Sequence, residues 1–476
     1  MKNTLLTSLL IAGAVTLHAA PDQPAPKPNI LILIADDLGW ADVGFNGSKE
    51  ILTPNIDSLA THGIRCTNGY VTAPQCSPSR AGLLTGRNQK RFGHENNNYL
   101  TACFATGQRV FPEHFKPAGY ATGIVGKWHI GDGPDGHPQQ HGFDEFYGFQ
   151  GGGQNYLAPR PQDLQNPVVR GTTPVPWDGR SYLTDTLGRE SADFIRRHTD
   201  RPWFLYTAFN APHMPMVMPP GYEEKVKHIK DAKRAVLAAM VMSMDDAVGK
   251  ILAALRATGQ EGRTLIVFLS DNGGTATPDK IVKNYSFNVP YRGVKGDVYE
   301  GGIRVPFVIQ WKDRLPEGKA YDAPVSSLDL LPTALAAAGV KPLPDVPLEG
   351  VNLLPHLAGE MKDPPHDHLC WSWQSAKAVR QGDWKWMVNN GSSPVELFNL
   401  AEDPYETNNL AAAHPKRVKS LQALFEAWNA KNPPLNPAHL VRETEKADGE
   451  PGDGEKSRPE AKAKITPLKQ PGRPAP

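Results

Sequence analysis

The sequence predicts an α/β fold, with a large mixed, mostly parallel sheet sandwiched by helices and a smaller C-terminal α+β subdomain. The first observation is a set of continuous apolar runs, which are typical of strands buried on both faces of a parallel sheet. These runs cover residues 29–35, 119–126, 203–208, 264–270 and 305–310. Helical patterns separate the runs, and polar residues follow them. Alternation of strands and helices favours this architecture.

The elements follow in chain order. Asn29 to Ala35 is rich in Ile and Leu and ends at two aspartates. Residues 53–60 begin with Thr-Pro and end shortly before Gly63, which are start and stop signals for a helix. The longest helical pattern covers residues 232–258 and leads into the apolar run at 264–270.

The composition changes after about residue 365, so we expect a main domain at 29–365 and a C-terminal subdomain at 366–440. Alternating aromatic and polar residues predict a small antiparallel sheet there. The aromatic residues are Trp371, Trp373, Trp384 and Trp386. A helical pattern follows at about 415–429. Residues 441–476 contain few large apolar residues, which predicts a disordered tail.

Composition narrows the range of partners. Lys and Arg number 51 and Asp and Glu number 50, so the net charge of +1 offers no electrostatic attraction to nucleic acid. Residues 1–20 resemble a cleaved signal peptide, with a basic start and an apolar run, and 21–28 form a Pro-rich spacer. We therefore expect a periplasmic or secreted protein. No later run of eighteen apolar residues appears, so no membrane insertion is expected.

Four cysteines in 476 residues do not form a disulfide scaffold. They are Cys66, Cys76, Cys103 and Cys370. Buried free thiols are the favoured interpretation. The alternative is a bridge between Cys66 and Cys103.

Carboxylates and an amide follow two of the predicted strands. Asp36 and Asp37 come after the run at 29–35, and Asp271 and Asn272 come after the run at 264–270. Ligands in open α/β sheets bind outside the carboxyl ends of the strands, so we expect these side chains to converge. Oxygen ligands select Ca²⁺ or Mg²⁺ rather than zinc. The alternative is a set of helix caps and turn residues.

The segment from Cys76 to Arg87 is the most informative stretch of the chain. It places a cysteine at the start of a predicted helix and Arg80 one turn later on the same face. A helix N-terminus attracts anions, and a guanidinium can bind an oxyanion with two hydrogen bonds. Lys127, His129, His213 and Lys295 also follow predicted strands or lie in a glycine-rich loop. Taken singly, each of these could be a surface or core residue.

The motif C-S-P-S-R-A-x-L-L-T-G-R resembles the signature of the type I sulfatases, which belong to the alkaline phosphatase superfamily. The resemblance covers about residues 28–410 and implies an alkaline phosphatase-like catalytic domain. It implies that a maturase oxidises Cys76 to formylglycine, whose hydrate attacks a sulfate ester to form a covalent sulfo-enzyme. It also implies Ca²⁺, favoured over Mg²⁺, bound by Asp36, Asp37, Cys76, Asp271 and Asn272. The sulfate-binding and proton-transfer set would be Arg80, Lys127, His129, His213 and Lys295.

The substrate is less well specified. The polar segment 88–98 follows the Cys76 helix and could contact the hydroxyls of a sugar, although it could equally be a surface loop. The candidate residues are Arg91, His94, Glu95 and Asn96. Trp40, Trp128 and Trp373 could stack on sugar faces, or lie in the core. The favoured substrate is a galactose- or hexosamine-type sulfated glycan.

Three other functions compete with this interpretation. A phosphonate or phosphodiester hydrolase of the same superfamily would share the metal site. A non-catalytic glycan-binding protein would keep an unmodified Cys76. A cytosolic cysteine hydrolase is disfavoured by the predicted signal peptide.

Overall fold

The structure is a computed structural model that describes residues 27–95, 97, 107–131, 133–157, 166–176, 180–277, 280–281, 284–345 and 347–433. The predicted signal peptide, most of the spacer, Asn96, Cys103 and the predicted tail lie outside these residues. Within them, no helix is both long and apolar enough to cross a membrane. Cys66 and Cys370 are free thiols, and Cys66 is buried, as favoured for the cysteines of this chain.

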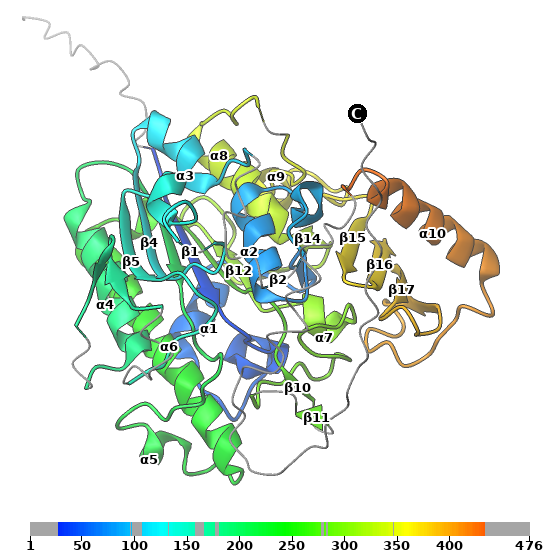
Figure 1. The fold of residues 1–476 in the computed structure, drawn as a ribbon, viewed down its shortest axis with the longest axis horizontal. Coiled ribbons are helices and arrows are strands. Elements are labelled where there is room, and N and C mark those ends of the chain that lie inside the picture. Colours follow the sequence, from blue (N-terminus) through cyan, green and yellow to red (C-terminus); the bar gives the residue numbers. More distant parts are fainter. Residues whose placement is uncertain are drawn as a thin grey trace, which may run out of the picture. The chain divides into compact units, whose positions relative to one another are not determined.

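A ten-stranded sheet forms the centre of the main domain (Figure 1). In spatial order its strands are β13 (Lys319–Tyr321), β2 (Ile64–Cys66), β12 (Phe307–Gln310), β9 (Thr264–Ser270), β1 (Asn29–Ala35), β8 (Trp203–Ala208), β4 (Ala121–Lys127), β5 (Glu145–Phe149), β6 (Val169–Arg170) and β7 (Thr173–Pro174). The strands from β9 to β5 in this order are all parallel. The mixed, mostly parallel sheet predicted from the sequence is therefore confirmed.

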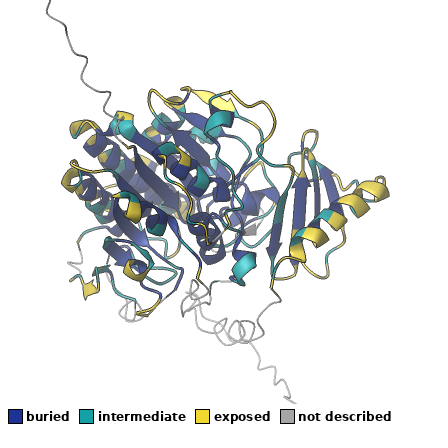
Figure 2. Ribbon diagram, turned by 90° about the horizontal axis from the view of Figure 1, so that it is seen from above, coloured by how far each residue is buried: buried dark blue, intermediate teal, exposed yellow. Residues whose placement is uncertain are grey.

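Both faces of the sheet are covered, which explains the continuous apolar runs. In β1, Ile30, Ile32 and Ile34 belong to one core, and Leu31, Leu33 and Ala35 to the other. The first core contains residues of α2 (Cys76–Thr85), α3 (Phe111–Phe115), α8 (Leu330–Ala338) and α9 (Leu354–Leu357). The second contains residues of α1 (Pro54–Thr61), α4 (Leu183–Arg197), α5 (Glu223–Val226) and α6 (Ala232–Ala257). Figure 2 shows the strands as buried between the helical layers.

The predicted run at 305–310 differs in direction from its neighbours. It forms β12, which begins at Phe307 and runs antiparallel to both β9 and β2. An apolar run reports burial on both faces, but it carries no information on strand direction. β6 and β7 are also antiparallel additions, at the opposite edge of the sheet.

Short elements complete the main domain. They are β3 (Gly69–Tyr70), β14 (Val325–Ser326), β10 (Ala276–Thr277), β11 (Lys280–Ile281) and α7 (Glu300–Ile303). The 3₁₀ turns are Trp40–Asp42, Gly44–Asn46, Gln89–Phe92, Lys116–Ala118, Pro138–His141, Glu261–Arg263 and Ser327–Asp329. α7 follows directly on the loop that contains Lys295.

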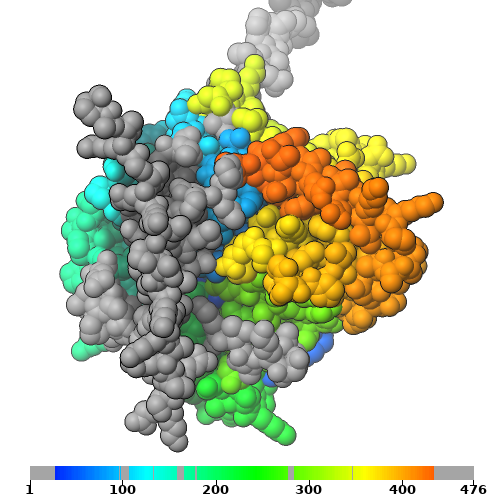
Figure 3. Space-filling model, turned by 45° about the vertical axis from the view of Figure 1, so that its right-hand side comes forward, coloured from blue at the N-terminus to red at the C-terminus, as the bar shows by residue number. Residues whose placement is uncertain are grey.

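The C-terminal region contains the predicted antiparallel sheet and helix. Its strands are β15 (Leu369–Trp373), β16 (Ala376–Gln381), β17 (Trp384–Val388) and β18 (Glu396–Asn399), and its helix is α10 (Pro415–Asn429). One face of the sheet, with Trp386 and Leu397, packs on Leu421 and Phe425 of α10. The other face, with Trp371 and Met387, joins the core of the main domain. Figure 3 shows this yellow and orange region next to the blue and green segments.

Buried charges also join the C-terminal sheet to the main domain. Lys385 of β17 lies 2.8 Å from Glu300 of α7 and 2.8 Å from Glu406, and all three side chains are buried. Glu300 also accepts a hydrogen bond from Tyr70. Burial and the charge of Glu300 raise the pKa of Glu406 to about 7, although Lys385 opposes the shift. The α7 region is thus held by the C-terminal sheet.

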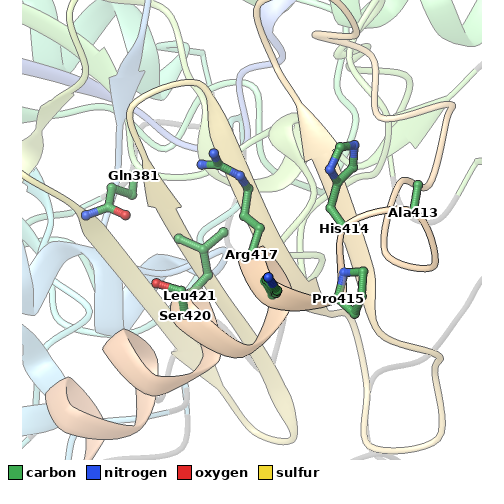
Figure 4. A pocket seen from close by; sticks show the side chains of 8 residues that line it. Gln381, Ala413, His414, Pro415, Arg417, Ser420 and Leu421 are labelled. Carbon is green, nitrogen blue, oxygen red and sulfur yellow. The ribbon is translucent and has the colours of Figure 1, made fainter.

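A cavity of about 610 Å³ lies where α10 begins, beside the end of β16 (Figure 4). It is lined by Gln381, Ala413, His414, Pro415, Lys416, Arg417, Ser420 and Leu421. None of these residues follows a strand of the central sheet, so the cavity is a feature of the C-terminal surface.

Candidate active site

The carboxyl ends of β1 and β9 bring the predicted acidic pairs together. The two strands are parallel neighbours with Ala35 opposite Ser270, so both chains leave the sheet at the same edge. The backbone N–H of Asp37 donates to Asp271 Oδ1 over 3.2 Å, and Asn272 Nδ2 donates to Asp37 Oδ1 over 2.7 Å. Asp36, Asp37, Asp271 and Asn272 are all fully buried. The predicted convergence of the four residues is confirmed.

Cys76 is the first residue of α2, and it points into this cluster. Its thiol donates to Asp36 Oδ1 over 3.3 Å, and Lys295 Nζ donates to the sulfur over 3.0 Å. Burial is the main cause that raises the pKa of Cys76 above its usual value, and the charge of Asp271 adds to it. An unmodified Cys76 is therefore a neutral thiol and a poor nucleophile at neutral pH.

Three cationic side chains balance the three carboxylates. Arg80 Nε and Nη2 each lie 2.8 Å from Asp271 Oδ2. Lys127 Nζ lies 2.6 Å from Asp36 Oδ2, and Lys295 Nζ lies 2.7 Å from Asp37 Oδ1. The ion pairs are almost completely removed from water. Removing one member of such a buried pair typically costs about 3–5 kcal/mol, because the partner is left as an uncompensated charge.

The surroundings shift the pKa values of Asp271 and Asp37 in opposite directions. Burial and the charge of Asp36 raise the pKa of Asp271 to about 6, even though Arg80 opposes the shift. Burial acts in the same direction on Asp37, but Lys295 and His213 outweigh it and hold the pKa of Asp37 well below its usual range.

Two histidines complete the cluster. His213 Nδ1 lies 2.8 Å from the carbonyl of Met214, which can only accept, so this nitrogen carries a proton. His213 Nε2 lies 3.7 Å from Asp37 Oδ2. Burial lowers the pKa of His213 to about 3, with Lys127 and Lys295 contributing and Asp37 opposing. Burial and then the charge of Lys127 also hold the pKa of His129 well below its usual value. Both histidines are therefore neutral in this structure.

The backbone around His129 is shaped for this arrangement. His129 has a φ of 56°, and its N–H donates to the carbonyl of Gln150 over 2.9 Å. A Cβ atom added at Gly152 would lie 2.7 Å from His129 Nε2. Only glycine can therefore stand at position 152 without displacing the ring. The importance of Gly152 was not evident from the sequence, where it is one of three consecutive glycines.

The donor set fits a hard divalent cation. One ligand atom from each of Asp36, Asp37, Cys76 and Asp271 lies within 4.8 Å of the others. Asp37 Oδ2 and Asn272 Oδ1 are buried without a hydrogen-bond partner among the described residues. A buried oxygen without a partner is costly, and a cation bound by oxygen ligands would satisfy both atoms. The cluster is thus a candidate metal centre.

Comparison with known proteins identifies the family. The sulfatase family model matches residues 28–340, which is more than half of the chain, and a model for the C-terminal region of N-sulphoglucosamine sulphohydrolase matches residues 294–427. The chain belongs to the sulfatase family. It is accordingly a sulfuric ester hydrolase, and the cluster at the ends of β1 and β9 lies within the matched region.

Several relatives match most of this sulfatase. N-acetylgalactosamine-6-sulfatase of Homo sapiens is 36% identical, with 88% of each chain covered. Arylsulfatase A of Bos taurus is 32% identical, with 89% of this chain and 92% of that protein covered. The crystal structure of Ps i-CgsB, solved also in complex with k-i-k-neocarrahexaose, has a TM-score of 0.79 and 35% identity, with 89% of this chain and 98% of that chain covered.

In the segment after α2 of this sulfatase, some of the predicted sugar-binding residues lie beside the Cys76 helix and others form ion pairs elsewhere. Arg91 donates hydrogen bonds to Glu349 and to the carbonyl of Trp428, and the second bond connects its turn to the end of α10. Glu95 forms a buried ion pair with Lys90. His94 Nε2 lies 2.7 Å from the hydroxyl of Ser77, the residue after Cys76. Asn96 lies outside the described residues, but Asn97 accepts a hydrogen bond from the N–H of Ser77 over 3.1 Å.

The three tryptophans that were candidates for stacking on a sugar differ in their burial. Trp128 is fully buried and donates to the carbonyl of Gly136, so it is a core residue. Trp40 is buried and packs edge-on against Tyr291. Trp373 is partly exposed and donates to Gln75 Oε1 over 3.0 Å. Because Gln75 directly precedes Cys76, Trp373 is the one of the three that lies both near the cluster and in contact with solvent.

Proposed function

We propose that this sulfatase removes sulfate from a galactose- or hexosamine-type sulfated glycan, using a formylglycine made from Cys76 and a bound Ca²⁺. The observation that carries the proposal is the position of Cys76, at the start of α2 and 3.0 Å from Lys295, among three buried carboxylates. The predicted signal peptide supports a periplasmic or secreted location for this activity.

The charge of the cluster explains how it would bind an anion. Asp36, Asp37 and Asp271 carry three negative charges, and Arg80, Lys127 and Lys295 carry three positive charges. A divalent cation held by Asp36, Asp37, Asp271, Asn272 and the modified Cys76 would leave the site with an excess of positive charge. The cation would supply Lewis acidity and would neutralise negative charge on the sulfate group. Arg80, Lys127 and Lys295 could then bind the sulfate oxygens, where charge is greatest in the transition state.

The modification of Cys76 would supply a stronger nucleophile than the neutral thiol. An aldehyde hydrate provides one hydroxyl to attack sulfur and a second that allows sulfate to be released, which a serine or a cysteine lacks. Because Cys76 is fully buried in the folded chain, the maturase must reach the segment 76–87 before this region folds. We therefore expect the maturase to be a transient partner of the unfolded chain.

The two histidines would handle the protons. His213 is the proposed acid for the departing sugar oxygen, through Nε2, which faces the cluster near Asp37. His213 is neutral in the absence of substrate, and the negative charge of a bound sulfate ester would raise the pKa of its imidazole. His129 is the proposed base that removes the proton from the second hydroxyl of the hydrate. Its Nδ1 is buried without a hydrogen-bond partner among the described residues.

A glycan substrate is supported by the relatives and by one exposed aromatic ring. N-acetylgalactosamine-6-sulfatases are about one-third identical to this chain, and Ps i-CgsB has been solved with k-i-k-neocarrahexaose. Trp373 offers a partly exposed indole next to Gln75, suited to stacking on a sugar face. Of the predicted sugar-binding residues, His94 lies next to the nucleophile helix and keeps this role in the proposal. Arg91 and Glu95 are each engaged in an ion pair. We therefore propose that they support the sugar-binding surface from beneath and do not contact the sugar.

The substrate class is tested by sulfate release from a panel of defined sugar sulfates. We expect hydrolysis of at least one galactose or N-acetylgalactosamine sulfate, and slower hydrolysis of the matching sugar phosphates. Turnover of aryl sulfates without release from any sugar would contradict the glycan assignment alone. Faster hydrolysis of phosphate esters or diesters would favour the phosphodiesterase alternative.

The formylglycine proposal predicts that Cys76→Ser lowers kcat on an aryl sulfate by about 10³-fold or more, as losses of catalytic nucleophiles do. Mass spectrometry of the wild-type peptide that contains residue 76 should show an aldehyde or its hydrate in place of the thiol. Cys370→Ser, at a free cysteine outside the cluster, is the matched control and should retain activity. An active protein whose Cys76 is entirely unmodified would refute the proposal.

The metal proposal predicts that chelator-treated protein melts at a lower temperature and that Ca²⁺ restores the Tm. Binding to the folded state alone stabilises by about 2.7 kcal/mol at a free concentration of 100 times the Kd. Asn272→Leu removes one ligand and should shift the Ca²⁺ titration to higher concentration. The exposed variant Glu317→Gln should titrate like the wild type. Identical Ca²⁺-dependent Tm shifts in Asn272→Leu and the wild type would exclude Asn272 as a ligand.

His213→Ala tests the proposed acid. The variant should lose more activity on sugar sulfates, whose alcohols need a proton to depart, than on aryl sulfates with acidic phenols. We expect a difference of about 10²-fold between the two losses in kcat, which is the usual range for general acid catalysis. His228→Ala, at an exposed histidine that contacts the carbonyl of Glu50, serves as the control. Equal losses on both substrate types would argue against this role.

A further inference from the structure

Lys295 reaches the cluster from a loop that lies outside the strands of the central sheet. The N–H of Lys295 donates to the carbonyl of Gly274 over 2.9 Å, and the N–H of Gly296 donates to the carbonyl of Pro74 over 2.8 Å. These two bonds fix the backbone at one point. Gly293 and Gly296 both have positive φ, at 87° and 92°, so the chain turns sharply on either side of Lys295. The direction of the lysine side chain therefore depends on what holds the turn itself.

The carboxylate of Asp297 connects the turn to its surroundings at a second point. The N–H of Asp297 donates to the carbonyl of Val294 over 2.9 Å, and Asp297 Oδ2 accepts the N–H of Val294 over 3.0 Å. The other oxygen, Asp297 Oδ1, accepts Asn389 Nδ2 over 2.9 Å. Asn389 Oδ1 in turn accepts the N–H of Val298 over 3.0 Å. One amide side chain thus binds the turn twice, once as a donor and once as an acceptor.

Asn389 belongs to the C-terminal sheet, immediately after β17. The same region makes further contacts with the loop and with α7: a Cβ atom added at Gly296 would lie 3.6 Å from the ring of Trp373, and Glu406 accepts the N–H of Glu300 over 2.7 Å. Asn389 itself contacts no member of the acidic cluster in the hydrogen bonds described. Its connection to the reacting atoms runs through Lys295, whose Nζ lies 3.0 Å from Cys76 Sγ.

We propose that Asn389 is a positioning residue, which sets the side chain of Lys295 for sulfate binding by holding the turn at 294–298. This inference rests on the proposed role of Lys295. Lysine has a long and flexible side chain, so a small rotation of its turn displaces Nζ by a large amount. Small misplacements of a catalytic group cost substantial rate, because the geometry of attack must be met closely. The C-terminal subdomain therefore completes the active site without contributing the lysine itself.

A double-mutant cycle tests the proposal with an aryl sulfate, whose turnover does not require glycan binding. Asn389→Ala should lower kcat/KM about tenfold in the wild-type background. In a Lys295→Met background the same change should cost less than about twofold, because the group that Asn389 positions is gone. An equal loss in both backgrounds would overturn the proposal. Unchanged activity of Lys295→Met would refute the role of Lys295, and the positioning inference with it.

Two further variants separate positioning from general stability. Asn409→Ala removes hydrogen bonds to Leu397, Ala411 and Val395 of the C-terminal region, and no hydrogen bond described joins Asn409 to the loop. It should retain kcat/KM within about twofold even if its Tm falls as far as that of Asn389→Ala. The swapped pair Asp297→Asn with Asn389→Asp keeps both hydrogen bonds, with the donor and acceptor of one exchanged. It should recover most of the activity lost in Asn389→Asp alone, and failure to do so would contradict the inference.

Discussion

The structure of the site depends on the burial of charge at the carboxyl ends of β1 and β9. Three carboxylates meet three cations there, with almost no access to water. Each charge would cost several kcal/mol if it were buried without a partner, so every member restricts the positions of the others. The parallel pairing of β1 with β9 supplies the fixed frame, because it brings Asp36 and Asp37 to the same edge of the sheet as Asp271 and Asn272. Cys76 then enters this frame from the start of α2.

The cations are supported in three different ways. Arg80 lies one turn after Cys76 on α2, so one helix orients both the Cys76 side chain and the guanidinium. Lys127 is the last residue of β4 and is positioned by the sheet. Lys295 lies on a loop whose turn is bound by Asn389 of the C-terminal sheet. The buried group of Glu300, Lys385 and Glu406 strengthens the same connection. The C-terminal sheet thus helps to hold the turn that contains Lys295.

Local sequence patterns are sufficient to locate the strands that are buried on both faces of the sheet. The runs at 29–35, 203–208 and 264–270 match β1, β8 and β9 in both bounds, because strands buried on two faces must be apolar throughout. The run at 305–310 is also a strand, but its antiparallel direction depends on how the chain returns to the sheet. The polar segment after α2 illustrates the limit more clearly. Nothing near Arg91 in the sequence indicates that Glu349 and Asn432 bind its guanidinium.

The sequence by itself determined the family motif at Cys76, the strands that end in carboxylates, and the residue types that suit a hard cation and an anionic ester. These features are local, because strand periodicity and helix-start chemistry depend on neighbouring residues. Only the tertiary structure decided which cation pairs with which carboxylate, that Trp373 lies beside Gln75, and that Asn389 holds the turn of Lys295. Those contacts join segments separated by 91 to 298 residues, and packing of the sheet and helices brings them together.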